Sequence, residues 1–543
     1  MEQLLIQDYA YNAAVALKNA LADLPGPRPP LVVLDLSGSY PARNLPRRPL
    51  DLLQPRPESL EEFCFKLSTL RNTPWLRGVV LRIGDLQVDL STAYALRRAI
   101  ADLASSKLVH VVANSLNMAQ YLVASAGGQL AVPESAELNL SGLALGRTYL
   151  KDALERYGIS FEKIAIQEYK SAFSEFTQSA MDDFDREQRT ALLRQLQRSF
   201  CEEVASSRRV QPETVEAWLQ EGVSSARRAK ELGAVDRIAY EDGLLGSQRL
   251  SLAQAARFLK LSPRRPGEPR LAVVSVLGTI VTGKSRRNPL PLPLLGGAMS
   301  GSESVIRALR LAERDPLVSA VVLYVDSGGG SALASDLIAH EVERIRRKKP
   351  VVGVMGTLAA SGGYYVLARC SRIVAAPTTL TGSIGVLSVK PVLQGFNQKY
   401  GLNPEVIKTA PLADLLSSDH PFSEQERAVV ERQVAEIYDR FLGQVAAGRG
   451  LSKQQVDAVG RGRIWSGKDA LDHRLVDELG DLELGLQRAR ELAGLPSDSP
   501  VWNIEAPRTL QLPDLEPAAL LQSWLPLLRE RVLLLASDLP TLR

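Results

Sequence analysis

The sequence predicts an α/β fold in tandem duplication, with mostly parallel sheets in each copy and helical extensions at the two ends. Short apolar runs rich in β-branched residues, which are typical of buried parallel strands, alternate with longer stretches of helical periodicity. This alternation indicates the α/β class. The same order of segments returns after about 240 residues, and a regular offset of this size indicates an internal duplication.

The composition is that of an ordinary globular protein. The chain has 543 residues, of which 45% are hydrophobic and 23% are charged, and this length predicts two to four domains. The net charge of +4 is too small to indicate nucleic-acid binding, so we expect no nucleic-acid partner. The three cysteines and four histidines are scattered without metal-ligand spacing, so we expect no disulfide framework, no metal and no cofactor.

Residues 1–30 form the first predicted element, a helical extension. Helical periodicity covers about residues 2–23 and ends at the sequence Pro-Gly-Pro that begins at Pro25. The stretch has no basic segment followed by an apolar core, so we do not expect a signal peptide. We expect this helix to pack on the first copy of the repeat.

Two copies of an α/β unit follow at residues 31–245 and 270–497, and a linker at 246–269 joins them. The linker ends in Pro-Arg-Arg-Pro-Gly-Glu-Pro, which is typical of a connection between domains. Four pairs of segments support the duplication: residues 31–36 resemble 271–276, 75–83 resemble 317–325, 111–113 resemble 351–353, and 229–238 resemble 470–479.

A last extension covers residues 498–543. Its segment 515–542 is rich in leucine, but Arg529, Glu530 and Arg531 interrupt it, which argues against a membrane span and predicts an amphipathic helix. We expect this helix to pack on the body of the protein, with assembly or contact with a membrane surface as the alternatives.

The second copy carries the strongest candidate for a catalytic group. A strand is predicted at 351–355 and a helix at 364–369, and the intervening Ala-Ala-Ser-Gly-Gly places Ser361 at the turn between them. A serine at such a turn can expose its hydroxyl beside backbone N–H groups that stabilise an oxyanion. Taken alone, a plain turn of small residues is an equally good interpretation.

A glycine turn precedes this serine in the same copy. The predicted strand at 317–326 is followed by Ser-Gly-Gly-Gly-Ser at 327–331 and then by a helix, and such a turn offers N–H groups to an anion. A phosphate loop would need a Lys-Ser/Thr pair after the last glycine, and a dinucleotide site would need G-x-G-x-x-G. We therefore predict an oxyanion turn, with Asp326 in a turn-capping role.

The first copy lacks both features and carries a lysine instead. Asn117 stands where the second copy has Ser361, and no glycine turn corresponds to 327–331. Lys170 in the first copy stands opposite Thr409 in the second. Because the serine is present in one copy and the lysine in the other, we predict one composite site.

Three motifs together carry a resemblance to a known family. They are Ala-Ala-Ser361-Gly-Gly-Tyr, Thr381-Gly382-Ser383-Ile384-Gly385 and Tyr169-Lys170-Ser171-Ala172. Over roughly residues 30–495 the chain resembles the signal peptide peptidase A family in its long, duplicated form. These are serine–lysine peptidases of family S49 with a Clp-protease/crotonase-like fold. The resemblance implies that Ser361 is the nucleophile, that Lys170 is the general base, and that Gly329 and Gly362 supply the oxyanion N–H groups.

The resemblance also implies substrates, assembly and location. It implies an ATP-independent endopeptidase that degrades cleaved signal peptides and other small or unfolded apolar polypeptides, and a homotetramer that encloses the active sites. Family members usually have proline where this chain has Gly328, and glycine fixes the turn less firmly. They commonly carry an N-terminal membrane anchor. Because this sequence shows none, we expect a cytoplasmic protein or one in peripheral contact with the inner membrane.

A lysine can act as a base only if its pKa is lowered. The pKa of a free lysine is about 10.4, and burial without a carboxylate partner lowers it by disfavouring the ammonium form. Aromatic and small residues flank Lys170, and we expect Glu168 and Glu175 to point away from it. Ser171 is a candidate to orient the amine through a hydroxyl hydrogen bond.

Two alternatives remain open. A Ser-His-Asp hydrolase could combine Ser361 with Asp414 and His420, although the serine lies in AASGG rather than in G-x-S-x-G. A non-catalytic scaffold would keep the repeats and would need neither Ser361 nor Lys170. The apolar loop at 288–299 could line a site for hydrophobic peptides, lie against a membrane, or pack beneath a neighbouring subunit.

Overall fold

The computed structural model describes residues 2–43, 56–244, 249–288, 297–504, 532–536 and 541–542. By packing, the chain divides into two units: unit 1 contains Met1–Leu143 and Leu196–Pro269, and unit 2 contains Ala144–Gln195 and Arg270–Arg543. The boundaries predicted from the repeat differ from this division, because residues 144–195 belong to the first copy in sequence yet pack with the second.

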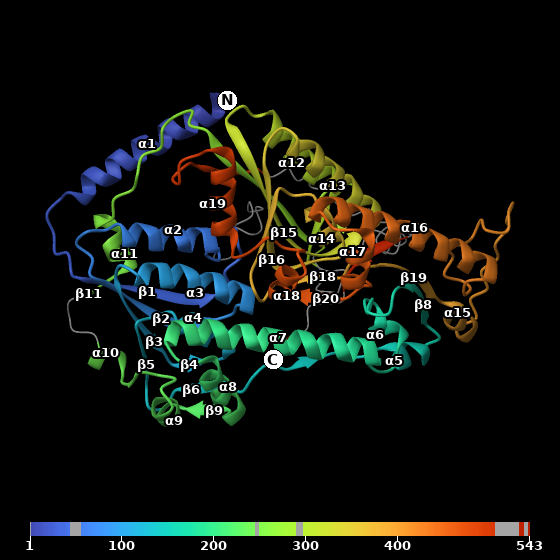
Figure 1. The fold of residues 1–543 in the computed structure, drawn as a ribbon, viewed down its shortest axis with the longest axis horizontal. Helices are drawn as coiled ribbons and strands as arrows, with labels where there is room; N and C mark the ends of the chain where they lie inside the picture. Colours follow the sequence, from blue (N-terminus) through green and yellow to red (C-terminus); the bar gives the residue numbers. More distant parts are fainter. Residues whose placement is uncertain are drawn as a thin grey trace. The chain divides into compact units, whose positions relative to one another are not determined.

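Six parallel strands form the core of unit 1 (Figure 1). In sheet order they are β10 (Arg237–Ile238), β5 (Gln129–Val132), β3 (Leu108–Ala113), β2 (Gly78–Leu86), β1 (Leu31–Gly38) and β11 (Arg249–Ser251). Val79, Val80 and Leu81 in β2 are buried, as continuous apolar runs in parallel strands covered on both faces require.

Side-chain caps begin the helices that follow β1 and β2. Ser59 forms a capping box with Glu62 at the start of α2 (Leu60–Arg71), and Asp89 caps α3 (Leu90–Ala104). Caps of this kind stabilise a helix by about 1 kcal/mol each. The other elements of unit 1 are β4 (Ser115–Leu116), α4 (Met118–Ala124), β6 (Glu137–Leu140), α8 (Pro212–Glu221), β9 (Val223–Ser225), α9 (Ala226–Glu231), α10 (Glu241–Leu244), α11 (Leu252–Ala255) and the 3-10 helix η2 (Ala256–Phe258).

The N-terminal extension is helical, as α1 (Glu2–Ala22). Lys18 donates a hydrogen bond to the carbonyl of Ala256 and Asn19 donates one to the carbonyl of Leu261, both at 2.8 Å, so α1 packs on unit 1. Within the part of the chain that the structure describes, no helix has the length and apolar content that crossing a membrane requires.

The main sheet of unit 2 has the same strand order as the sheet of unit 1. The parallel neighbours are β21 (Glu478–Leu479), β17 (Arg372–Ala375), β16 (Val351–Ala360), β15 (Val318–Ser331), β12 (Arg270–Val281) and β22 (Val501–Asn503). In this order, the six strands correspond one by one to β10, β5, β3, β2, β1 and β11 of unit 1. The structure therefore confirms the duplication and the α/β class with mostly parallel sheets.

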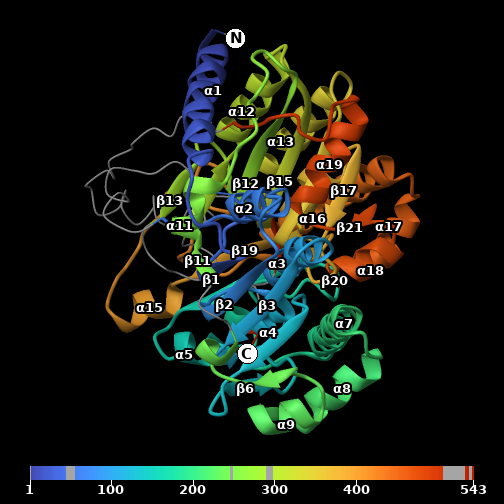
Figure 2. The same cartoon turned by 90° about the vertical axis from the view of Figure 1, so that its left-hand side faces the viewer.

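Helices cover this sheet at several places (Figure 2). The helices α12 (Ser302–Arg314) and α13 (Ala332–Arg346) pack against each other and on β12 and β15, and α19 (Leu482–Ala493) packs on β15 and β16. The helices α7 (Asp183–Arg208) and α16 (Glu424–Arg449), with 26 residues each, occupy corresponding places in the two copies. One of the boundaries between the units, after Gln195, falls within α7.

Antiparallel strands extend the sheet of unit 2 beyond the repeat. Strand β8 (Ser160–Ile166) pairs with β19 (Val386–Val392) along its whole length, and β23 (Leu533–Leu535) pairs with both β15 and β19. The other elements of unit 2 are β7 (Leu145–Gly146), α5 (Lys151–Glu155), α6 (Ser174–Thr177), β13 (Arg286–Asn288), β14 (Gly297–Gly301), α14 (Gly362–Leu367), β18 (Leu380–Gly382), α15 (Gln394–Lys399), α17 (Lys453–Val459), β20 (Ile464–Ser466), α18 (Gly467–Asp472) and β24 (Thr541–Leu542).

Two predicted segments fall largely outside the described residues. The amphipathic helix expected at 515–542 is one of them, and its described residues 532–536 contain strand β23 rather than helix. The apolar loop expected at 288–299 is the other, since residues 289–296 are not among those described.

Candidate active site

Ser361 occupies a sharp turn between a strand and a helix, as the sequence predicted. It follows the last residue of β16 and precedes the first residue of α14. Its backbone has φ of 53° and ψ of −115°, a conformation that a residue with a side chain adopts only when the surrounding structure enforces it. The Ser361 N–H donates to the carbonyl of Gly382 at 2.8 Å, which helps to hold the turn, and the side chain is fully buried.

Lys170 reaches Ser361 inside unit 2. The lysine follows β8, in the segment that belongs to the first copy by sequence and to unit 2 by packing. The distance between Nζ of Lys170 and Oγ of Ser361 is 2.7 Å, within hydrogen-bond range. The structure thus brings together, in one chain, the serine of one copy and the lysine of the other.

Burial lowers the pKa of Lys170 well below its usual value. The side chain is only 2% exposed, and desolvation of the ammonium is the main cause of the lowered pKa. The positive charge of Lys163 is the second cause. Lys163 lies in β8 and donates hydrogen bonds to the carbonyl of Lys170 at 3.2 Å and to Oγ of Ser174 at 2.9 Å. Burial also lowers the pKa of Lys163, to about 8.

The two acidic residues near Lys170 in sequence bind other partners. Glu168 forms an ion pair with Arg461 at 3.7 Å, and Glu175 forms one with Arg147. The expectation that both would point away from Lys170 is therefore confirmed. Without a carboxylate partner, nothing offsets the cost of burying the ammonium form.

Ser383, rather than Ser171, contacts the amine of Lys170. Nζ of Lys170 lies 3.1 Å from Oγ of Ser383 and donates to its backbone carbonyl at 3.0 Å. The hydroxyl of Ser171 accepts a hydrogen bond from the side-chain amide of Gln188 at 3.3 Å. Ser171, the candidate from the sequence, therefore directs its hydroxyl to Gln188, and adjacent residues in an extended segment point their side chains in different directions.

The glycine turn at the end of β15 lies against the serine turn. Gly329 and Gly330 have φ of 101° and 154°, which only glycine adopts without strain. A Cβ atom at Gly329 would lie 2.6 Å from the amide nitrogen of Gly362, so the two predicted oxyanion residues are neighbours. The N–H of Gly329 donates to Oγ of Ser327 at 3.0 Å, so this donor already has a partner.

Asp326, at the same end of β15, makes a structural contact. Its carboxylate accepts a hydrogen bond from the backbone N–H of Leu358 in β16 at 3.0 Å. This bond joins two neighbouring strands next to the turn, which agrees with the structural role predicted for Asp326.

The alternative triad is not assembled in the described residues. His420 and Asp414 do meet, with Nε2 of the histidine 3.1 Å from the carboxylate. Ser361, however, makes its side-chain contacts with Lys170 and with the carbonyl of Gly385. Glu426 lies close enough to His420 and Asp414 for the three groups to face a common point, but Asp414 is already paired with Lys408 at 2.9 Å.

The first copy uses the corresponding position to begin a helix. Asn117 caps α4 and forms a capping box with Gln120, each side chain accepting a hydrogen bond from the other residue's backbone at 2.9 Å. Its φ of −86° is ordinary for a cap residue. Asn117 therefore has a structural role at the position where Ser361 directs its hydroxyl to Lys170.

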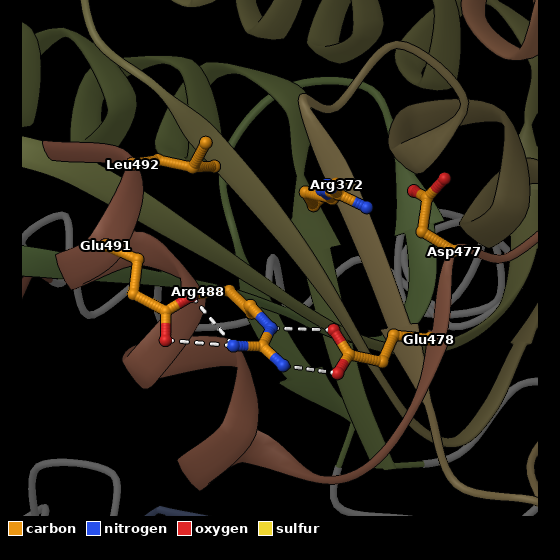
Figure 3. A pocket seen from close by; sticks show the side chains of 6 residues that line it. All are labelled: Arg372, Asp477, Glu478, Arg488, Glu491 and Leu492. Carbon is orange, nitrogen blue, oxygen red and sulfur yellow. Dashed lines mark hydrogen bonds and ion pairs between the residues drawn. The ribbon is translucent and has the colours of Figure 1, made fainter.

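A pocket of about 500 Å³ in unit 2 shares no lining residue with this site (Figure 3). Arg488 extends between Glu478 and Glu491 and donates to both at 2.7 Å, so its charge is balanced within the protein. The full lining is Arg372, Asp477, Glu478, Arg488, Glu491 and Leu492.

Sequence reasoning did not assign the roles of Ser383 and Lys163. Ser383 stands in the Thr-Gly-Ser-Ile-Gly motif, which was a usable indication. Lys163 gave no such indication, because a lysine in a half-buried strand looks like an ordinary surface residue until the strand pairing is known.

Comparison with known proteins places the chain in a family. The profile described as Peptidase family S49 matches residues 101–254 and 343–496, which together make up more than half of the chain. The two matches cover corresponding parts of the two copies, which agrees with the duplication.

Curated relatives match most of the chain. It is 28% identical over 459 residues to "Serine protease SPPA, chloroplastic" from Arabidopsis thaliana, which covers 81% of this chain and 67% of that protein. It is 28% identical over 472 residues to "Protease 4" from Haemophilus influenzae, which covers 82% of this chain and 75% of that protein. With "Protease 4" from Salmonella typhi the identity is 29% over 420 residues, or 74% of this chain and 66% of that protein.

Among solved structures, a mutant of ClpP1 from Listeria monocytogenes is similar to part of the chain. The match has a TM-score of 0.25 and 18% identity, and covers 39% of this chain and 94% of that chain. A TM-score this low carries no argument about the site.

Proposed function

This chain belongs to peptidase family S49 and is a serine peptidase, and we propose that Ser361 is its nucleophile and Lys170 its general base. The observation that carries the proposal is the 2.7 Å contact between Nζ of Lys170 and Oγ of Ser361. This contact lies in a buried site where burial lowers the pKa of the lysine and no carboxylate restores it. A lowered pKa widens the pH range in which the lysine is neutral, and the neutral amine can accept a proton.

The proposed reaction has two halves. Oγ of Ser361 attacks the carbonyl carbon of the substrate while its proton passes to Nζ of Lys170. The oxyanion is stabilised by backbone N–H groups, for which Gly362 and Gly329 are the candidates. When the intermediate collapses, the leaving amine takes the proton from Lys170, and water then hydrolyses the acyl-enzyme ester with Lys170 again as base.

The oxyanion role of Gly329 needs one local change. Its N–H donates to Oγ of Ser327, so the Ser327 hydroxyl must give up this donor when an oxyanion forms. A neutral hydroxyl is a weaker acceptor than an oxyanion, which favours the exchange.

We propose that the substrates are cleaved signal peptides and other small or unfolded apolar polypeptides, and that hydrolysis needs no ATP. The glycine turn lacks the Lys-Ser/Thr pair of a phosphate loop, which supports ATP independence. Apolar side chains near Lys170, among them the buried Ala172 and Phe173, support a preference for apolar peptides.

We propose that four copies assemble into a homotetramer. Light scattering should then give four times the chain mass of 59.2 kDa, and a monomeric mass would contradict the proposal. Location in the cytoplasm, or in peripheral contact with the inner membrane, stays a prediction.

The test of the dyad compares hydrolysis of an apolar peptide ester by the wild type, Ser361→Ala, Lys170→Ala and Lys170→Arg. Each substitution should lower kcat by at least about a thousandfold, since the residues of a catalytic unit fail together. His420→Ala is the matched control and should keep its activity. Circular dichroism and light scattering check that each variant folds and assembles. An active Lys170→Ala together with an inactive His420→Ala would favour the Ser-His-Asp alternative.

A further inference from the structure

A segment near the end of the chain forms the strand β23 between two strands of the candidate active site. Strand β23 is antiparallel to both β15 and β19. At its ends, the N–H of Ala536 donates to the carbonyl of Gly328 at 2.7 Å, and the N–H of Ala332 donates to the carbonyl of Val532 at 3.3 Å. Its register pairs Leu533 with Ser331, Leu534 with Gly330, and Leu535 with Gly329 on one side, and Leu533 with Leu387 on the other.

The carbonyl of Leu534 lies beside both glycines proposed for the oxyanion hole. A Cβ atom at Gly329 would collide with this oxygen, and a Cβ atom at Gly362 would lie 3.0 Å from it. The N–H of Gly362 lies near the same place, since it is 2.6 Å from the Cβ position of Gly329. The backbone of β23 therefore passes the site where the carbonyl of a substrate must lie.

The side chains of β23 fill apolar surroundings on both faces. Leu533 and Leu535 pack with Ala172, Phe173 and Leu387 in one buried cluster. Ala172 and Phe173 come directly after the Lys170-Ser171 pair, so this cluster adjoins the general base.

The opposite face belongs to a different cluster. Val532 and Leu534 join the main hydrophobic core of unit 2. All residues from 532 to 536 are buried, so the segment makes close contacts along its whole described length.

This arrangement is the one that binds extended peptides by strand addition. In that mode, main-chain hydrogen bonds to a sheet edge provide affinity, and pockets for alternate side chains provide specificity. Here the edge of β15 supplies the main-chain partners, and the cluster with Phe173 supplies the pocket. The N–H of Gly329 donates to Oγ of Ser327 beside this strand.

We infer that the slot between β15 and β19 is the substrate groove, and that residues 532–536 occupy it as an intramolecular competitor of the substrate. The inference rests on the proposed function, because it takes the serine and lysine as the catalytic pair. It adds that substrates bind extended and antiparallel to β15, with apolar side chains at the positions of Leu533 and Leu535. Substrate must displace this segment before it can be cut.

The test measures binding rather than hydrolysis. The protein is the full chain with Ser361→Ala, and the probe is a fluorescein-labelled Val-Leu-Leu-Leu-Ala amide followed by anisotropy. Adding Leu533→Asp and Leu535→Asp should free the groove and tighten probe binding at least tenfold. Leu337→Asp with Leu492→Asp is the matched control, because these leucines are exposed, and it should bind like the parent. Equal affinity in the two double variants would overturn the inference.

A second variant avoids charges in the core. Leu387→Cys with Leu533→Cys places two cysteines at directly paired positions, where a disulfide can form. In the Ser361→Ala background, the oxidised protein should bind the probe at least tenfold more weakly than the reduced protein. If both forms bind the probe equally, β23 is a permanent part of the sheet and the inference is wrong.

These results can be separated from a failure of the proposed function. Probe binding needs no chemistry, so it can be read even if the wild type hydrolyses no ester. Loss of the dyad proposal would appear as activity that persists in Ser361→Ala or Lys170→Ala. If the groove inference is wrong, the affinity for the probe will be the same whether β23 is displaced, cross-linked or unchanged.

Discussion

Burial of Lys170 favours its proposed role as a base and opposes folding. Because the pKa is lowered in the native state, the unfolded chain holds a proton that the native chain lacks, between the native pKa and the usual value of about 10.4. The free energy of unfolding therefore rises with pH across that window, and below it the cost stays constant. Catalysis has the same direction, since only the neutral amine accepts the serine proton.

Lys163 should set where on the pH scale the enzyme becomes active. Its charge disfavours the ammonium form of Lys170, so Lys163→Met should raise the pKa of Lys170 and move the midpoint of the pH–kcat/KM profile to higher pH. The profile itself should rise with pH to a plateau. Lys163→Arg keeps a positive charge and is the control, and its midpoint should not move upward. An unmoved midpoint in Lys163→Met would contradict the electrostatic role.

The two serines near the base should differ in effect. Ser383→Ala removes the hydroxyl at 3.1 Å from Nζ, and the loss of one orienting hydrogen bond should lower kcat by about tenfold. Ser171→Ala removes a hydroxyl that contacts Gln188 instead, and should change kcat by less than about twofold. Steady-state kinetics of the two purified variants measure both values of kcat. A larger loss of kcat in Ser171→Ala than in Ser383→Ala would show that Ser171 orients the amine.

At the scale of the elements, the glycine turn at the end of β15 contains one glycine that a larger residue cannot replace without strain and one that a larger residue can replace. Gly329 has φ of 101°, and any side chain there meets backbone atoms of Leu534 and Gly362, which cannot easily move. Gly328 has no left-handed φ, and a Cβ there would meet the end of the Leu358 side chain at 3.1 Å, which can rotate away. Although position 328 has glycine instead of proline, the close contacts of Gly329 with Leu534 and Gly362 still fix the turn.

Substitution by alanine should reveal this difference. Gly329→Ala should lower kcat/KM by about a hundredfold or more, because the strained turn shifts a candidate oxyanion donor. Gly328→Ala should stay within several-fold of the wild type. Thermal melting of both variants shows whether folding is kept. If Gly329→Ala were fully active, the turn would have no part in catalysis.

At the scale of the whole molecule, the two copies have the same strand order, but the turns that contain Asn117 and Ser361 have different roles. Asn117 caps a helix where Ser361 presents a hydroxyl. Asn117→Ala should therefore lower the free energy of unfolding by about 1 kcal/mol and leave kcat unchanged. Denaturant unfolding followed by tryptophan fluorescence, together with ester hydrolysis, checks both parts. A large loss of activity in a folded variant would show that the helix cap at Asn117 also influences the site.

The local sequence patterns of the chain were enough to predict much of the fold and part of the candidate site. Apolar runs predicted the strands, and Ala-Ala-Ser-Gly-Gly predicted the turn at Ser361, because each depends on residues close in sequence. Comparing the two copies, together with the family resemblance, predicted that Lys170 belongs to the site, and the structure places it beside Ser361. The roles of Ser383 and Lys163 depend on which strands meet, and a leucine-rich run such as 532–536 suits a helix and a strand equally well. Only the pairing of β23 with β15 decides between them.

The packing of residues 144–195 with unit 2 limits how the gene can be divided. A cut at the 246–269 linker looks natural from the repeat, but a fragment beginning at Arg270 would lack β8. Strand β19 would then present an unpaired, apolar edge, and edges of this kind recruit other chains. Such a fragment should aggregate when produced alone. A soluble catalytic unit would instead need residues 144–195 grafted onto it, in the manner of a circular permutation.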